Sequence, residues 1–270
     1  MRIITPPRRW APLRLREVWE FRDLFKRFVA RDLTLRYRQT ALGVVWVVLQ
    51  PLLGAGVLSF VFGRIAHLPS DGVPYFVFAY VGMLAWNTLS STVTKISTSL
   101  TGNQQLISKI FFPRLVLPLS TLGSTIIDFA VAVVMLGVIL VVQGVTPSRT
   151  ILTLPIWLLL LVLLGSGIGL AAAALMVSYR DVGYVLPVLL QVGLYASPVA
   201  YSITAVPTTV RWVVTLNPIT GLLEGFRSAC LGLPLPSSAL LAWSAVCSIA
   251  AFFGGALVFA DRERRFADVI

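Results

Sequence analysis

Few side chains in this 270-residue sequence have the type and position needed for chemistry. Asp128 is the clearest candidate, because it is the one ionisable residue in the apolar run 115–142 and such groups often belong to ion or proton pathways. The structural alternative is a buried carboxylate whose partners are Lys95, Thr121, Ser124 or Thr125. We favour this alternative, since a proton-coupled carrier usually needs more than one such group.

The sequence motifs of several enzyme classes are absent. There is no G-x-x-x-x-G-K-[ST] sequence, so the chain cannot bind ATP phosphates in a P-loop. One histidine, His67, and two distant cysteines, Cys230 and Cys247, cannot form a zinc site or a disulfide framework. No two carboxylates are spaced to suggest glycosyl chemistry. We therefore expect neither catalysis nor a metal or cofactor on this chain.

The composition is that of an integral membrane protein. Hydrophobic residues make up 57% of the chain and charged residues 12%, about half the charged fraction of a soluble domain. The net charge of +11 could indicate nucleic-acid binding, but 11 of the 22 basic residues precede residue 40 and no soluble module remains to carry such a site. A basic, membrane-facing N-terminus without the features of a signal peptide is the better interpretation.

Residues 1–38 are expected to form a basic N-terminus, and residues 39–270 a transmembrane domain. From Leu13 to Leu35, apolar residues recur every three to four positions between arginines and lysines, which predicts an amphipathic helix in the headgroup plane. Six charge-poor intervals then predict membrane spans, each about as long as a bilayer core requires: 39–63, 72–94, 115–142, 150–178, 182–201 and 237–260. The fourth contains GSGIGLAAAA, small residues that permit close helix packing.

Between the last two spans the chain is broken by prolines and glycines. It predicts two short helices, 207–216 and 218–231, that dip into the membrane from the outer face, where such backbone must lie against protein or water. The fold class is therefore all-α, with six transmembrane helices, an N-terminal amphipathic helix and a re-entrant helix pair before the last span.

The distribution of basic residues predicts the orientation. Six spans place both termini on one side, and all lysines and arginines except Arg64, Arg149, Arg211 and Arg227 fall on that side. The positive-inside rule makes it the cytoplasm. The cytoplasmic segments would then include residues 95–114 and a charged turn formed by Tyr179, Arg180 and Asp181. Tyr184, Tyr195 and Tyr201 flank the broken segment and are candidates for lining a conduit, although interfacial belts explain most membrane aromatics.

Five segments resemble those of one family when taken in order. They are RDLTLRYRQTALGVVWVVLQPL, NQQLISKIFFPR, SYRDV, ASPVAYSI and LNPITGLLEGFR. Together with the amphipathic helix they resemble the membrane subunit of ABC-2-type polysaccharide exporters, most closely the Wzm permeases of O-antigen and other lipid-linked glycans. The teichoic acid exporter permease TarG is a related protein.

This resemblance implies a permease homodimer in the cytoplasmic (inner) membrane that binds two copies of a Wzt-like ATPase, which would hold the ATP and Mg²⁺. It places a coupling loop at 102–114 and extracytoplasmic gate helices at 203–232. The coupling positions are Asn103, Leu106, Lys109, Phe112, Pro113 and Arg114. The gate positions are Asn217, Pro218, Glu224 and Arg227. The arginines Arg31, Arg36 and Arg38 would guide a pyrophosphate-bearing lipid to the entrance.

Three alternatives remain open at this point. The first is an ABC-2 permease for another substrate, such as a drug, a lipid or teichoic acid. The second is a proton-coupled carrier, in which neutralising Asp128 would abolish transport. The third is a membrane enzyme that polymerises glycans, which would work without an ATPase partner.

Overall fold

The computed structural model describes residues 19–38, 45–109, 112–146 and 149–263. Every regular element within these ranges is helical. The predicted helix 13–35 lies partly outside them. The helices are α2 (Arg22–Arg38), α3 (Val45–Leu58), α4 (Tyr75–Thr98), α5 (Gln104–Lys109), α6 (Val116–Val142), α7 (Leu154–Ser178), α8 (Val182–Ala196), α9 (Thr208–Leu216), α10 (Pro218–Leu231) and α11 (Ser238–Arg262).

Five helical segments in the described ranges are long and apolar enough to cross a membrane. They are α3 with its π-helical extension to Ile65, α4, α6, α7 with the short 3-10 segment before it, and α11. Each has the 20 or so residues that a hydrocarbon core of roughly 30 Å requires. The chain is therefore an all-helical membrane protein, as the sequence predicted.

The fifth predicted span, 182–201, is only partly helical. α8 ends at Ala196 after 15 residues. It runs antiparallel to α4, since Leu186 shares a cluster with Val93 and the backbone at Gly193 lies against Trp86. The non-helical residues that follow α8 continue toward the start of α4, where Ala200 meets Tyr75. The chain thus follows this path with a short helix and then a non-helical segment of turns and bends.

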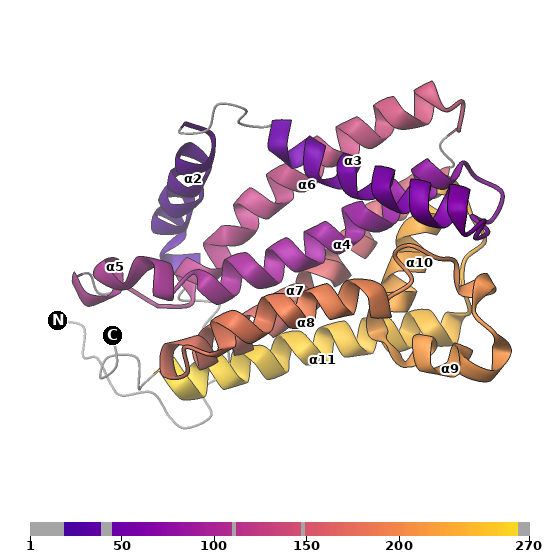
Figure 1. Cartoon of the computed structure of the whole chain (residues 1–270). Helices are drawn as coiled ribbons and strands as arrows, with labels where there is room; N and C mark the ends of the chain where they lie inside the picture. Colours follow the sequence, from indigo (N-terminus) through magenta and orange to yellow (C-terminus); the bar gives the residue numbers. More distant parts are fainter. Residues whose placement is uncertain (1–18, 39–44, 110–111, 147–148, 264–270) are drawn as a thin grey trace.

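The helices form an elongated bundle around α4 (Figure 1). α4 packs on α3, α6, α7, α8 and α10, and most of its residues are buried. α2 and α5 lie at one end of the bundle, here called the α5 end, and α9 and α10 lie at the other, the α10 end (Figure 1). Any conformational change that couples the two ends must therefore be transmitted along α4 and the helices packed on it.

Proline, asparagine, serine and glycine set the ends of the helices at the α10 end. Asn217 accepts a hydrogen bond from the Ile219 amide, and Pro218 occupies the first position of α10, where no amide donor is needed. Gly232 ends α10 with φ 69°, a left-handed conformation that glycine adopts without steric cost. These residues explain why two short helices form here instead of one long one.

α7 and α11 make the closest helix contact in the described part of the chain. A Cβ atom on Gly255 would stand 1.9 Å from the Gly167 carbonyl oxygen, and one on Gly167 would stand 2.2 Å from the Ala251 carbonyl. Real Cβ atoms do not approach backbone so closely, so both positions require glycine. The small residues of the fourth predicted span thus serve close packing, as expected.

We predict that Gly255→Val destabilises the protein by about 3 kcal/mol or more, because the added side chain must push the two backbones apart. Gly254→Val is the matched control, since a Cβ atom at Gly254 meets no atom within 4 Å. Thermal unfolding of both variants in lipid nanodiscs checks this. Equal losses in the two variants would contradict the contact.

Candidate functional site

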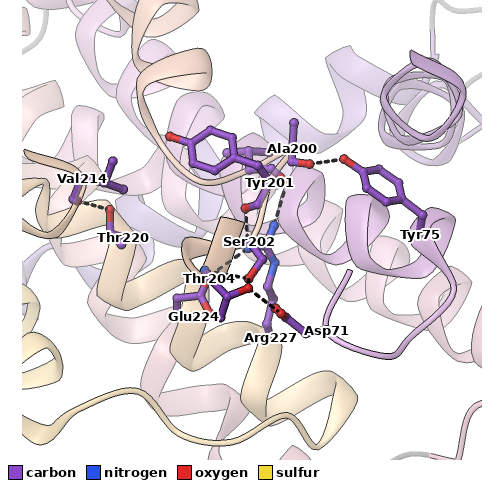
Figure 2. A network of polar contacts seen from close by, with 11 residues as sticks. Asp71, Tyr75, Ala200, Tyr201, Ser202, Thr204, Val214, Thr220, Glu224 and Arg227 are labelled. Atoms are coloured by element: carbon purple, nitrogen blue, oxygen red, sulfur yellow. Dashed lines mark hydrogen bonds and ion pairs between the residues drawn. The ribbon is translucent and has the colours of Figure 1, made fainter. Parts of the chain in front are cut away.

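A fully buried arginine organises the α10 end. The side chain of Arg227 on α10 has no solvent exposure. Its Nη1 atom lies 3.0 Å from the Glu224 carboxylate one turn earlier, and its guanidinium carbon lies 3.7 Å from the centre of the Phe78 ring on α4. The charge is therefore balanced by an ion pair and a cation–π contact. Figure 2 shows how Arg227 points toward the segment after α8.

The backbone after α8 receives its hydrogen bonds from side chains. Arg227 donates from Nη2 to the Val199 carbonyl at 2.7 Å and from Nη1 to the Tyr201 carbonyl at 3.4 Å. Between them, the Tyr75 hydroxyl donates to the Ala200 carbonyl (Figure 2). Three successive carbonyls outside any helix are thus satisfied by α10 and α4, as non-helical backbone at membrane depth requires.

Gly82 on α4 makes room for this arrangement. A Cβ atom there would stand 2.6 Å from the Val199 carbonyl oxygen and 2.9 Å from Nη2 of Arg227. Any larger residue would therefore displace either the backbone or the guanidinium.

A second set of polar contacts joins the loop before α4 to the segment after α8. Thr204 donates from its hydroxyl to Asp71 at 2.9 Å, and its amide donates to the Ser202 hydroxyl at 3.2 Å (Figure 2). Asp71 itself has a left-handed φ of 54°. Asp71 also acts electrostatically on Glu224 and Arg227, so the loop, the segment and α10 form one charged cluster.

The four predicted gate positions meet in this cluster or at its border. Asn217 donates from Nδ2 to the Ser197 hydroxyl at 2.9 Å, and Pro218 begins α10. Burial raises the pKa of the Glu224 carboxyl, while the charge and hydrogen bond of Arg227 lower it. Their assignment as a gate remains a prediction, but the structure brings these residues together around Ser197–Tyr201.

Three residues of the predicted coupling loop connect the α5 end to the bundle. The rings of Phe112 and of Phe28 on α2 pack in a T-shaped arrangement, with their centres 5.6 Å apart. Leu106 packs on the same buried cluster. Arg114 donates to the backbone carbonyl of Glu263, just after α11, at 2.6 Å. The segment is therefore tied to both α2 and α11.

The other three coupling positions differ in their surroundings. Asn103 donates to the Ser99 carbonyl at the end of α4 at 2.8 Å. The Pro113 carbonyl accepts from the Val116 amide, which starts α6. Lys109 at the end of α5 is exposed.

The predicted cytoplasmic turn Tyr179–Asp181 lies beside the end of α11. All three residues are exposed, and the Arg262 guanidinium lies 5.8 Å from the centre of the Tyr179 ring. Because Arg114 contacts Glu263, the last turn of α11 lies between this turn and the coupling loop. The structure therefore brings the two predicted contact segments to one helix end.

The predicted entry arginines are described only in part. Arg31 on α2 forms an ion pair with Asp32 at 2.9 Å and lies 5.1 Å from the centre of the Phe28 ring. Arg36 and Arg38 belong to the last turn of α2, and their side chains lie outside the described residues. Their role as a lipid entry remains a prediction.

Asp128 has the partner that the structural interpretation required. Its Oδ2 atom lies 2.8 Å from Nζ of Lys95 on α4. Lys95 also donates to the hydroxyls of Ser124 at 3.0 Å and Thr125 at 3.2 Å. The pair joins α4 to α6 inside the bundle, so its two charges balance each other at membrane depth.

The three tyrosines proposed for a conduit do not share one environment. Tyr184 and Tyr195 are exposed on α8 and lie eleven positions, or about three turns, apart on the same helix face. Tyr201 is half-buried in the Arg227 cluster (Figure 2). Only the first two are placed to line a surface along α8.

Sequence reasoning missed several members of the Arg227 cluster. They are Asp71, Tyr75, Phe78, Gly82, Ser202 and Thr204. All of them except Ser202, which pairs with nearby Thr204, have a partner more than a hundred positions away. No local pattern could reveal them. Within the described residues, no three His, Cys, Asp or Glu side chains gather to hold a metal ion.

Residues 23–231 match the family described as ABC-2 type transporter. This match covers more than half of the chain and includes both ends of the bundle described above. The chain belongs to the ABC-2 type transporter family. Within the family match lie the coupling loop, the turn at Tyr179 and the whole Arg227 cluster.

This ABC-2 family member is similar to named permeases over most of its length. It is 26% identical to the O-antigen export system permease protein RfbA of Myxococcus xanthus, covering 95% of this chain and 98% of that protein. It is 28% identical to RfbA of Klebsiella pneumoniae over 76% of this chain and 79% of the relative. The polysialic acid transport protein KpsM of Escherichia coli is 24% identical, over 86% and 91%.

We predict that Arg227→Met destabilises this ABC-2 protein by roughly 3–5 kcal/mol, because Glu224 loses its partner while it stays buried. The matched substitution Arg211→Met, at a half-buried arginine that donates only to backbone carbonyls among its described bonds, should cost about 1 kcal/mol. Fluorescence-detected thermal unfolding in nanodiscs compares the two. Arg227→Met combined with Glu224→Leu should recover part of the loss. No recovery would show that the ion pair is not the cause.

Because Lys95 and Asp128 form an ion pair, we predict that the effects of substituting them on stability are not additive. Lys95→Met or Asp128→Leu alone should each lower stability by about 3 kcal/mol, because the remaining charge then loses its ion-pair partner in the bundle. The double variant should be more stable than the sum of both effects indicates. Unfolding curves of the four proteins in the same nanodiscs measure this, and strict additivity would argue against the pair.

Proposed function

We propose that this chain is the membrane permease subunit of an ATP-driven exporter of lipid-linked polysaccharide, of the O-antigen type. The observation that carries this proposal is the likeness to an O-antigen export permease over 95% of this chain and 98% of that relative. The polysialic acid transporter among the relatives also has a polysaccharide as its named cargo. This supports a glycan over a drug as the substrate.

ATP hydrolysis would take place on a separate partner chain. The sequence has no P-loop of its own, and ABC-2 permeases are the membrane part of transporters driven by ATPases. Two copies of the permease and two Wzt-like ATPase chains, with ATP and Mg²⁺ bound by the latter, form the proposed complex in the inner membrane. Both termini and the α5 end face the cytoplasm, in keeping with the basic residues gathered there.

The ATPase binds the α5 end in this proposal. Lys109 and Arg180 are exposed there, while Phe112 and Arg114 attach the coupling loop to α2 and α11. A displacement of the loop is therefore transmitted to both α2 and α11, because tightly packed elements move as rigid bodies and do not bend.

The polysaccharide leaves at the α10 end. Arg31, Arg36 and Arg38 on α2 attract the pyrophosphate of the lipid carrier at the opposite end. The exposed face of α8 with Tyr184 and Tyr195 lines part of the path, where aromatic rings stack on sugars. α9 and α10 close the outer opening and are fixed to the end of α8 through Arg227.

A proton-coupled carrier fits the structure less well. That carrier would depend on Asp128 for transport, whereas this carboxylate forms an ion pair with Lys95 at 2.8 Å, as the structural interpretation expected.

We predict that the wild-type chain co-purifies with a co-expressed candidate ATPase and stimulates ATP turnover, and that Lys109→Glu weakens both. Lys109 is exposed, so its reversal changes the docking surface rather than the packing. The matched control is Arg149→Glu, an exposed basic residue at the α10 end. Pull-down and ATPase assays measure both effects, and surface display of the glycan reports on export.

Three outcomes would overturn parts of this proposal. If no candidate ATPase binds the wild type, the ABC exporter assignment of this subunit fails. If Lys109→Glu and Arg149→Glu lower binding equally, the α5 end is not the docking site. If the complex forms and hydrolyses ATP but glycan display is independent of it, the polysaccharide is the wrong substrate.

A further inference from the structure

An apolar cavity lies where α6, α7 and α10 meet, near the α10 end. Its volume is about 300 Å³, and its lining offers almost no polar surface. The wall includes Val133, Leu136, Gly137, Val141, Ile151 and Cys230. The cavity is lined by none of the four named gate residues and none of the coupling residues, and Cys230 is its only lining residue from the predicted gate segment 203–232.

The cavity has a buried floor and an exposed rim. Cys230 on α10 is fully buried and Leu136 nearly so, whereas Val141 is 80% exposed. Gly137 is also exposed, and the neighbouring Val134 and Val138 on α6 show their side chains to the surroundings. The opening is thus on the outer side of α6, a helix long and apolar enough to cross a membrane.

The medium at this opening is the hydrocarbon of the bilayer. Water does not fill a cavity without polar partners, and an empty void would deprive its walls of packing contacts. A helix of a second copy is too wide to enter, since its diameter with side chains is about 10–12 Å. A flexible hydrocarbon chain has the right chemistry and thickness.

We propose that this cavity binds an acyl chain of a membrane phospholipid. Phospholipid is the solvent that surrounds α6, so its chains meet the opening at the highest concentration of any candidate. The chain lies against the Cys230 thiol and between the last turns of α6 and the first turns of α7. This site is a property of the permease itself and does not depend on which substrate is exported.

The bound chain supports the last turn of α10. Thr150, beside the cavity wall, donates from its hydroxyl to the Ser228 carbonyl at 2.9 Å and lies 3.4 Å from the Ala229 carbonyl. Cys230 follows directly, and Arg227 precedes this turn. The lipid thus fills the space next to the residues that hold α10 in place, and its loss should loosen the Arg227 cluster.

Photo-crosslinking of the full chain tests this site. The probe is a phosphatidylcholine with a diazirine near the end of one acyl chain, present in nanodiscs, with crosslinked peptides mapped by mass spectrometry. Crosslinks should concentrate on the cavity wall, at residues 133–141, 151–154 and Cys230. Gly137→Phe should reduce them several-fold, because its ring occupies the cavity. Gly254→Phe is the matched control and should change nothing here. A Cβ atom meets no other atom within 4 Å at either glycine, so neither substitution clashes with the backbone.

Several results would overturn the proposal. Crosslinks spread evenly over exposed helix faces, or crosslinks unchanged by Gly137→Phe, would show that no acyl chain is held here. A polyprenyl probe captured in preference to the phospholipid would assign the cavity to the isoprenoid carrier. A crosslink between Val141 residues of two chains would assign it to a second copy. Thermal unfolding of Gly137→Phe provides an independent check, since filling the cavity should lessen the loss of stability that delipidation causes in the wild type.

Discussion

A backbone carbonyl that is shielded from water needs a hydrogen-bond donor from the protein itself, and this requirement determines the structure of the α10 end. The helix α8 stops at Ala196, so the carbonyls that follow it cannot use helical hydrogen bonds. Arg227 supplies two of the missing donors and Tyr75 a third. Because a bare guanidinium is costly to bury, Glu224 and the Phe78 ring accompany it, and Gly82 leaves the space it needs. One broken helix thus fixes the residue types at five positions on two other helices, α4 and α10.

The two ends of the molecule are held together by different kinds of contact. At the α10 end the contacts are polar and hold a backbone segment in place. At the α5 end they are mainly aromatic and aliphatic, with Phe28, Phe112 and Phe259 in one buried cluster. Arg114 adds a hydrogen bond to the Glu263 carbonyl just after α11. The polar contacts at the α10 end therefore hold the segment after α8 in place. At the α5 end, charged side chains are exposed around a packed apolar cluster.

The helix limits were largely readable from the sequence. Charge-poor intervals and the positions of Pro207, Asn217 and Pro218 placed the short helices within about one residue of α9 and α10. The pairing of Asp128 with Lys95 was among the alternatives because Asp128 stands in one apolar run and Lys95 directly follows another. The end of α8 was predicted too late, since Ser197–Tyr201 is apolar enough to read as helix. The Tyr75–Ala200 and Asp71–Thr204 contacts depend on three-dimensional packing, and sequence periodicity carries no information about it.

The contact between Gly167 and Gly255 also bears on how this protein can change shape. Two backbones in direct contact can neither slide nor separate without losing their packing, so α7 and α11 behave as one rigid block. α3 and α8 are held far less tightly: α3 buries only Pro51 and Ala55, and α8 only Leu186. Each of these two helices also carries an internal proline, Pro51 or Pro187, which removes a backbone hydrogen bond and makes the helix easier to bend. Flexibility is therefore concentrated in α3 and α8, which can bend against the rigid pair of α7 and α11.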